Sequence, residues 1–179
     1  MSKKVGVLAI QGAYVKHSDM LKSLGADVRL VKSNNDFDDI DRLVIPGGES
    51  TTLLNVIEKH SLFDRLYDFC SKNPVFGTCA GSIVLSKGQG YLGLIDLTVE
   101  RNAYGRQLDS FVTNLDFDNK SVSGVFIRAP KFVAVGDNVD VLSNYNQSPV
   151  LVRQGNILVS SFHPELTNDA SIHQYFLNM

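Results

Sequence analysis

The segment Gly77-Thr78-Cys79-Ala80-Gly81 constrains the fold of this chain more than any other. A short apolar run, Pro74-Val75-Phe76, precedes it, and a second, Ser82-Ile83-Val84-Leu85, follows it. This order predicts a strand, a tight turn with a cysteine at its apex, and then a helix. The pattern G-x-C-x-G is the cysteine counterpart of the nucleophile elbow, where glycines are needed because a Cβ would clash in so sharp a turn. The alternative is a buried cysteine in an ordinary turn, so the motif needs support from the rest of the chain.

The apex position predicts that the Cys79 side chain stands exposed above the edge of the sheet. The N-terminus of the following helix lies beneath it and favours the thiolate, which is the nucleophilic form. Cys70, the second cysteine, follows Leu66 by four residues and Phe63 by seven, which is the spacing of one helix face. Cys70 is therefore expected in the core, and Cys79 is the candidate nucleophile.

The first half of the chain alternates apolar strand patterns with helical ones. We expect strands at Val5–Ile10, Val28–Val31 and Leu43–Ile45, and helices at Tyr14–Leu24, 50–59 and Leu62–Ser71. Val15 and Leu21 mark the expected core face of the first helix, and Ser50 or Thr51 is expected to cap the second. The alternation predicts an α/β fold with three αβα layers around a mainly parallel sheet.

After Gly93 the pattern changes to short strands separated by turn residues. The expected strands are 95–100, 111–115, 122–127, 139–142, 150–152 and 157–160, with a final helix from Ser171. The second half is therefore expected to be β-rich. No linker interrupts the chain, and 179 residues suit one sizeable core, so we expect residues 1–179 to form a single domain.

Composition excludes several classes of partner. The net charge is −2 with both signs mixed along the chain, which gives no basic surface for nucleic acid. No apolar run approaches the ~20 residues of a membrane span. The chain enters a strand directly after Met1 with no signal-peptide pattern, and its two cysteines suit a reducing compartment. We therefore expect a cytoplasmic protein with no nucleic-acid or membrane partner.

The sequence also gives no sign of a metal or a cofactor. No spacing of His, Cys, Asp and Glu resembles a zinc site, and there is no P-loop. The glycines of Gly88–Gly93 match G-x-G-x-x-G, but they follow a helix and precede a strand, which is the reverse of a dinucleotide-binding context.

A cysteine nucleophile requires a base, and the base requires an orienting group. His163 follows the apolar run 157–162 and so stands at the carboxyl end of a strand, where open α/β sheets bind ligands. Pro164 forces His163 into an extended conformation, so Glu165, two residues on, lies beside it. A solvated strand-end turn is the alternative reading. The other three histidines lie in helical patterns and are expected at the surface: His17, His60 and His173.

Attack on a carbonyl creates an oxyanion, which requires preorganised N–H donors. Ala80 can supply one from the elbow, and Gly47, in the turn after another strand, can supply the second. Arginines in the loops 101–107 and 127–130 offer forked donors for a substrate α-carboxylate, although ordinary loop charge is the simpler explanation of each loop taken alone.

These segments together resemble class I glutamine amidotransferases over nearly the whole chain. The elbow and His163-Pro164-Glu165 are shared across that class. Three further segments resemble, more narrowly, the glutaminase subunit of pyridoxal 5′-phosphate synthase: Gly47-Gly48-Glu49-Ser50-Thr51, Glu100-Arg101-Asn102 and Phe126-Ile127-Arg128-Ala129-Pro130.

The resemblance implies a flavodoxin-like fold that hydrolyses L-glutamine to glutamate and ammonia. It implies Cys79 as the nucleophile, His163 as the general base and acid, and Glu165 as the orienting carboxylate. It places the glutamine at Gly47, Gly48, Glu49, Arg106, Ile127 and Arg128. It also implies that ammonia passes through a tunnel to a synthase subunit in a large hetero-oligomeric complex, because ammonia released into water becomes ammonium.

Two other functions remain open on the sequence alone. One is a related cysteine hydrolase, either an amidotransferase subunit of another pathway or a protease-like enzyme on the same fold. The other is a non-catalytic binding module, which would be expected to lack one of the three residues Cys79, His163 and Glu165. All three are present.

Overall fold

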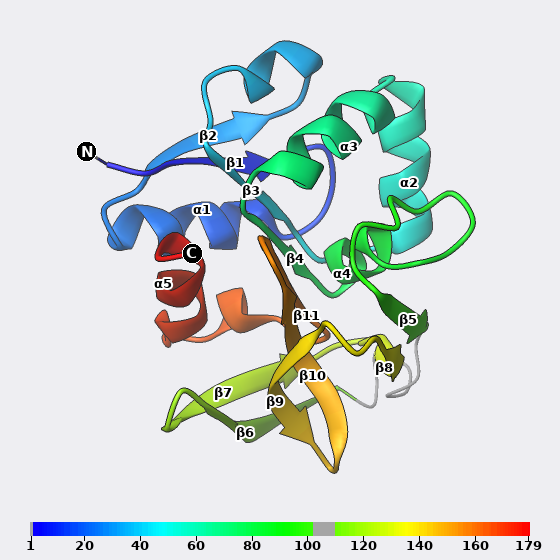
Figure 1. The fold of residues 1–179 in the computed structure, drawn as a ribbon. Helices are drawn as coiled ribbons and strands as arrows, with labels where there is room; N and C mark the ends of the chain where they lie inside the picture. The colour runs from blue at the N-terminus through cyan, green and yellow to red at the C-terminus, as the bar shows by residue number, and fades with distance from the viewer. Residues whose placement is uncertain (1, 102–109) are drawn as a thin grey trace.

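A seven-stranded, mainly parallel sheet organises the computed structural model, which describes residues 2–101 and 110–179 (Figure 1). Its strand order is β2 (Asp27–Val31), β1 (Lys4–Leu8), β3 (Arg42–Ile45), β4 (Val75–Thr78), β11 (Ile157–Ser160), β10 (Ser148–Gln154) and β9 (Asp140–Tyr145). The first five strands are parallel to their neighbours, and β10 and β9 form an antiparallel edge. The order of the parallel strands is flavodoxin-like, as the predicted α/β fold requires.

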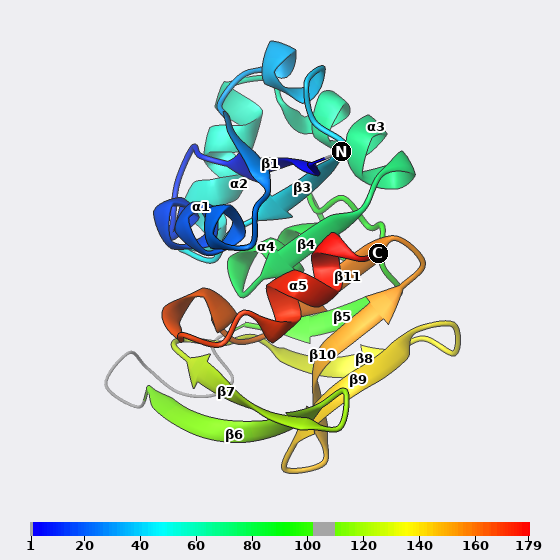
Figure 2. The same cartoon turned by 90° about the vertical axis from the view of Figure 1, so that its left-hand side faces the viewer.

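Helices cover both faces of this sheet, which gives the predicted three layers (Figures 1 and 2). One face carries α1 (Tyr14–Ser23) and α5 (Ser171–Leu177), and the other carries α2 (Ser50–Lys59), α3 (Phe63–Lys72) and α4 (Ala80–Leu85). Each face has its own hydrophobic core, one containing Phe76 and the other Leu85. Short 3₁₀ turns lie at Asn34–Phe37 (η1) and Pro164–Leu166 (η3).

The second half adds two small antiparallel sheets beside the main one. β5 (Leu97–Glu100) pairs with β8 (Lys131–Val135), and β6 (Phe111–Phe117) pairs with β7 (Lys120–Phe126). Strand β8 was not predicted. Its burial does not alternate, since Phe132 is its one buried side chain, so it lacks the period-two pattern that reveals a strand.

The buried face of α1 differs from the predicted one. Val15 is 55% exposed, whereas His17 and Leu21 are fully buried. His173 in α5 is also fully buried, and its Nε2 lies 2.8 Å from His17 Nδ1. The prediction that His17 and His173 lie at the surface is therefore wrong, because each buried ring has a polar partner that helical periodicity cannot reveal. His60 is exposed, as predicted.

The cap of α2 also differs from the prediction. The N-cap is Glu49 rather than Ser50 or Thr51, and its carboxylate accepts hydrogen bonds from the backbone N–H groups of Thr51 and Thr52 at 3.0 and 2.6 Å. The hydroxyl and N–H of Thr52, followed by the N–H of Thr51, lower the pKa of Glu49 to about 2. The carboxylate is thus held at the helix N-terminus, where negative charge is favoured.

Both cysteines are free and buried. Cys70 lies on the buried face of α3, as predicted, and burial raises the pKa of its thiol far above the ordinary value, which makes it a poor nucleophile. Within residues 2–101 and 110–179, no helix has the length and apolar character needed to span a membrane. The same residues contain no cluster of three His, Cys, Asp or Glu side chains that could hold a metal ion.

Candidate active site

The turn between β4 and α4 holds Cys79 in a strained backbone conformation. Its φ is 48° and its ψ is −104°, a region that L-residues rarely adopt and that is found mostly at functional sites. The flanking glycines are required by close packing. A Cβ on Gly77 would lie 2.7 Å from the Gly81 carbonyl oxygen, and one on Gly81 would overlap the Ile45 carbonyl oxygen. The structure therefore has the predicted strand, sharp turn and helix.

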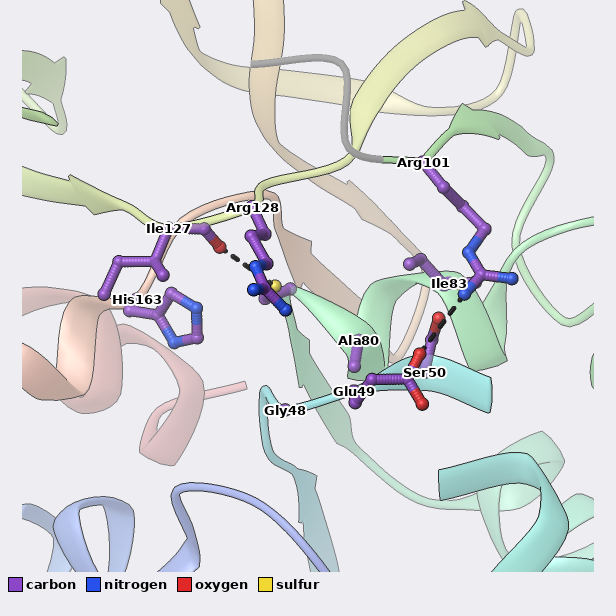
Figure 3. A pocket seen from close by; sticks show the side chains of 10 residues that line it. Gly48, Glu49, Ser50, Ala80, Ile83, Arg101, Ile127, Arg128 and His163 are labelled. Atoms are coloured by element: carbon purple, nitrogen blue, oxygen red, sulfur yellow. Dashed lines mark hydrogen bonds and ion pairs between the residues drawn. The ribbon is translucent and has the colours of Figure 1, made fainter. Parts of the chain in front are cut away.

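The Cys79 side chain lies at the bottom of a cavity rather than exposed above the sheet. It is 4% exposed, so the prediction of an exposed thiol is wrong. The loops that follow other strands form walls above the elbow, and they enclose about 270 Å³ (Figure 3). The residues that line this cavity with Cys79 are Gly48, Glu49, Ser50, Ala80, Ile83, Arg101, Ile127, Arg128 and His163.

His163 and Glu165 lie beside each other, as their spacing predicted. His163 Nδ1 and Glu165 Oε1 form a hydrogen bond of 2.7 Å. The backbone N–H of His163 donates to the Val125 carbonyl at 2.8 Å, which fixes the residue between β11 and β7. Glu165 is 3% exposed and stands behind the ring, so the histidine alone of the two lines the cavity. This arrangement leaves Nε2 of the ring available to the thiol and to a substrate.

Electrostatics favour the charged forms of this pair. Burial disfavours a charged ring, but hydrogen bonding and charge interaction with Cys79 and Glu165 outweigh it and raise the pKa of His163 to about 10. Burial also opposes the charge on Glu165, yet His17 and His163 hold the pKa of this carboxyl below its usual range. An imidazolium next to Cys79 stabilises negative charge on the sulfur, so the arrangement suits a thiolate–imidazolium pair.

The N–H of Gly47, one of the two predicted oxyanion donors, is bonded outside the cavity in this structure. The N–H of Gly47 donates to Thr78 Oγ1 at 3.0 Å, and its carbonyl accepts from Ala13 N–H at 3.0 Å. Both polar groups of Gly47 are thus engaged outside the cavity. The C=O and N–H of one trans peptide point in opposite directions, so a Gly47 carbonyl that faces Ala13 directs the Gly48 N–H away from it. Gly48 lines the cavity, and so does Ala80, the first residue of α4.

The loop after β1 supports this turn from behind. Gly12 has φ of 89°, and a Cβ there would overlap the Gly47 carbonyl oxygen. On its other side, Gly47 is packed against the site itself, because a Cβ on Gly47 would lie 3.1 Å from Cys79 Cβ and would overlap the His163 ring. Two glycines therefore let the segments that follow four strands, β1, β3, β4 and β11, meet at one point.

Ile127 and Arg128 form one wall of the cavity, opposite Glu49 and Ser50 (Figure 3). The Ile127 carbonyl oxygen lies 3.9 Å from Cys79 Sγ, which makes a weak hydrogen bond when the sulfur carries a proton. Arg128 has φ of 47°, a left-handed conformation that is uncommon for a residue with a long side chain. A second strained residue at the cavity is a further mark of a functional site.

Arg101 lines the other side of the cavity; it belongs to the loop 101–107 whose arginines were considered for a substrate carboxylate, although the family resemblance did not place it at the glutamine. Its Nη2 donates to Thr51 Oγ1 at 2.8 Å and lies 3.4 Å from Glu49 Oε1. The sequence feature that could have identified Arg101 as a site residue is its place in the segment Glu100-Arg101-Asn102, one of the three segments that carry the narrower family resemblance. Arg106, which was predicted to bind the substrate, lies outside the described residues.

Comparison with known proteins agrees with this geometry. Residues 7–179 match the family model of the SNO glutamine amidotransferase family. The chain belongs to this family. A curated relative, pyridoxal 5'-phosphate synthase subunit PdxT of Francisella tularensis subsp. novicida (strain U112), is 72% identical over all 179 residues of both chains. The protein of the same name from Francisella tularensis subsp. holarctica (strain LVS) is 71% identical over the same span.

Solved structures of other proteins have the fold of this SNO-family chain. A crystal structure described as a glutamine amidotransferase superposes with a TM-score of 0.91 and 43% identity, covering 97% of each chain. PurLQS from Thermotoga maritima superposes with a TM-score of 0.78 over 99% of each chain. Its identity is 17%, so it shows the fold alone. Family membership confirms the resemblance drawn from the motifs.

Proposed function

We propose that this SNO-family chain is the glutaminase subunit of a cytoplasmic pyridoxal 5′-phosphate synthase, and that it hydrolyses L-glutamine to glutamate and ammonia. The observation that carries the proposal is the strained Cys79 elbow at the bottom of a cavity that His163 also lines, with Glu165 hydrogen-bonded behind the ring. The 72% identity to the PdxT subunit supports the choice of pathway.

The reaction begins when the Cys79 thiolate attacks the side-chain amide carbon of glutamine. The oxyanion that forms accepts hydrogen bonds from the backbone donors at the elbow and at the turn after β3. His163, already an imidazolium, gives its Nε2 proton to the departing nitrogen, and ammonia leaves as the thioester forms. The neutral ring then takes a proton from water, whose hydroxide attacks the thioester carbonyl. Glutamate departs, and the thiolate–imidazolium pair is restored.

The two oxyanion donors are Ala80 N–H and an N–H of the Gly47-Gly48 turn. In this conformation Gly48 is the better placed of the two glycines, because Gly47 N–H is bonded to Thr78. Gly47 contributes its own N–H only after that bond breaks, and the absence of a Cβ makes such a rotation easy.

The rest of the cavity suits the α-amino-acid end of glutamine. The Arg128 guanidinium offers a forked donor to the α-carboxylate, and the family resemblance adds Arg106. The Ile127 carbonyl and the Glu49 side of the cavity offer acceptors to the α-ammonium group. The ammonia product is useful only before water protonates it, which is why the proposal includes a tunnel to the synthase subunit.

The first test is glutamate formation with and without the synthase subunit. The isolated chain is expected to be slow, because the Gly47-Gly48 turn has no side chain that fixes its peptides, and the synthase subunit is expected to hold the Gly48 N–H towards the cavity when it docks. Gaining such a donor is worth about 10²–10³ in kcat, so an excess of the synthase subunit is expected to raise kcat by that factor with a smaller change in KM. Full activity without the partner would exclude the gating. No glutamate under either condition would exclude the proposed function.

Gly12→Ala is expected to impair activity through the oxyanion turn. The added methyl group would push against the Gly47 carbonyl and displace the Gly47-Gly48 peptide. We expect kcat to fall about 10²-fold, since small misplacements of catalytic groups have costs of that order. The matched control is Gly25→Ala, because Gly25 has a similar φ of 82° but nothing within 4 Å of the added Cβ. Equal kcat values for the two variants would show that the contact is irrelevant to catalysis.

A further inference from the structure

A buried polar network lies behind the candidate triad and connects two helices to it. His17 Nδ1, in α1, lies 2.8 Å from His173 Nε2, in α5. The opposite nitrogen, His17 Nε2, lies 3.1 Å from Thr78 Oγ1 and 3.4 Å from Glu165 Oε2. Both histidine rings are fully buried, and the mechanism above uses neither. Imidazole is costly to bury for packing alone, so this histidine pair, His17 and His173, calls for an explanation.

The surroundings select one arrangement of protons in the histidine pair. His173 Nδ1 is buried with no hydrogen-bond partner among the described residues, and a lone pair there costs less than an orphaned N–H. The proton of His173 therefore sits on Nε2 and is donated to His17 Nδ1. His17 then carries its own proton on Nε2, directed at Thr78 and Glu165. The negative charge on Glu165 favours the same choice, because a ring lone pair at 3.4 Å would be repelled.

Both rings are neutral in this arrangement. Burial is the main cause that lowers the pKa of His17, and it lowers the pKa of His173 to about 3. The groups that face His17 are His173 from α5, Thr78 from β4 and Glu165 from η3, with His163 beyond the carboxylate. Phe76 covers the rings from the sheet, with its centroid 6.3 Å from that of His17 and 5.6 Å from that of His173.

The Nε2–H of His17 therefore lies beside two groups of the site, the Glu165 carboxylate and the Thr78 hydroxyl. Glu165 holds the His163 ring with Oε1, and its Oε2 has no hydrogen bond of standard geometry among the described residues, so His17 Nε2–H, at 3.4 Å, is a donor available to it. Thr78 Oγ1, the other group beside this N–H, is the acceptor that holds Gly47 N–H. A single imidazole thus connects the carboxylate that orients the base to the turn that supplies an oxyanion donor.

We propose that His17 and His173 are positioning residues for glutamine hydrolysis: His173 fixes the tautomer of His17, and His17 holds Glu165 and Thr78 in their working orientations. This inference rests on the proposed function, since it assigns a role within that reaction. Neither residue touches the cavity, and both act through Glu165 and Thr78.

The test compares two amide variants of His17 in the presence of the synthase subunit. In His17→Gln the amide NH₂ reaches the position of Nε2 and still donates towards Glu165. In His17→Asn the shorter amide stays near the position of Nδ1, so that donor is lost. Both variants bury an amide of the same polarity, which makes them a matched pair. Ser143→Ala is the control for a general loss of buried polarity, because it removes a buried hydroxyl in β9 that has no hydrogen-bond partner among the described residues.

We expect His17→Asn to lower kcat about 10- to 100-fold with little change in KM, and His17→Gln to recover most of that loss. We also expect the alkaline limb of the kcat–pH profile to move to lower pH in His17→Asn. A loosely held Glu165 supports the charged His163 ring less, so the ring loses its proton earlier. Thermal melts identify any variant that is unfolded at the assay temperature.

The outcomes separate this inference from the proposed function. Inactive wild-type protein would refute the function itself. Active wild-type protein with equal kcat values for folded His17→Asn and His17→Gln, or with an unshifted pH profile, would overturn the positioning role alone. If His17→Asn does not fold, His173→Leu provides the second variant. It removes the donor that fixes the His17 tautomer, and it is expected to shift the same limb in the same direction.

Discussion

Cys79→Ser is expected to abolish glutaminase activity while the protein stays folded. A serine hydroxyl at the elbow does not ionise near neutral pH, so the imidazolium of His163 has no anion to stabilise and no nucleophile to serve. We expect kcat to fall by about 10⁴-fold or more, as for loss of a nucleophile from a cooperating triad. Besides its interaction with His163, the sulfur lies 3.9 Å from the Ile127 carbonyl, and a serine side chain has nearly the same shape, so the replacement changes packing little. Glutamate release in the presence of the synthase subunit measures the effect.

Cys70→Ser is the matched control for that experiment. The substitution is the same, but Cys70 is fully buried on the core face of α3 and does not line the cavity. A hydroxyl there costs roughly 1–3 kcal/mol of folding free energy, because it is removed from water. Thermal melts should therefore show the larger loss for Cys70→Ser, and activity assays the larger loss for Cys79→Ser. Substantial turnover by Cys79→Ser would remove this residue from the mechanism.

His163→Asn is expected to be nearly as damaging as the loss of the thiol, and Glu165→Gln less so. The ring carries the proton that the leaving ammonia needs, whereas the carboxylate orients the ring and stabilises its charge. Members of a triad act as a unit, with the orienting residue the least costly to remove. Steady-state kcat for each variant decides the ranking. A larger loss for Glu165→Gln than for His163→Asn would mean that the two roles are misassigned.

His163→Asn also gives a prediction for how the stability of the folded protein depends on pH. The pKa of His163 is raised from an ordinary value near 6.5 to about 10 in the folded protein. A group with a raised folded-state pKa contributes stability in full below the unfolded value and loses it as pH rises through the folded value. The wild type should therefore lose melting temperature between about pH 6.5 and pH 10 beyond any loss seen in His163→Asn. Parallel curves would show that the charged ring is not retained in the folded state.

The parts of the site that were predictable are local in sequence. The elbow was visible because its glycines, its cysteine and its flanking runs are contiguous, and Glu165 could be placed beside His163 because only one proline separates them. The parallel sheet was visible because strands buried on both faces are continuous apolar runs. These features depend on chain geometry over a few residues, which periodicity and turn chemistry describe well.

The parts that were missed depend on contacts between distant segments. His17 faces the core because its ring has polar partners in β4 and α5. Helical periodicity within α1 carries no information about those partners, and it favoured Val15 as the buried residue instead. The direction of the Gly47 peptide depends on Ala13 and Thr78, from two other strand ends. The burial of Cys79 depends on loops that rise from several elements around it. No local pattern contains this information.

The position of β11 also determines when the chemistry is assembled during synthesis. The last strand along the chain lies between β4 and β10, and it pairs with β4 in parallel. As the polypeptide emerges from the ribosome, β4 presents Cys79 beside an open strand edge long before β11 and His163 have been made. The nascent chain therefore holds a thiol with no proton donor and an unpaired edge prone to wrong pairing. When β11 pairs with β4, the same step covers this edge and brings His163 next to Cys79. Hydrolysis therefore begins only in a chain whose sheet is complete.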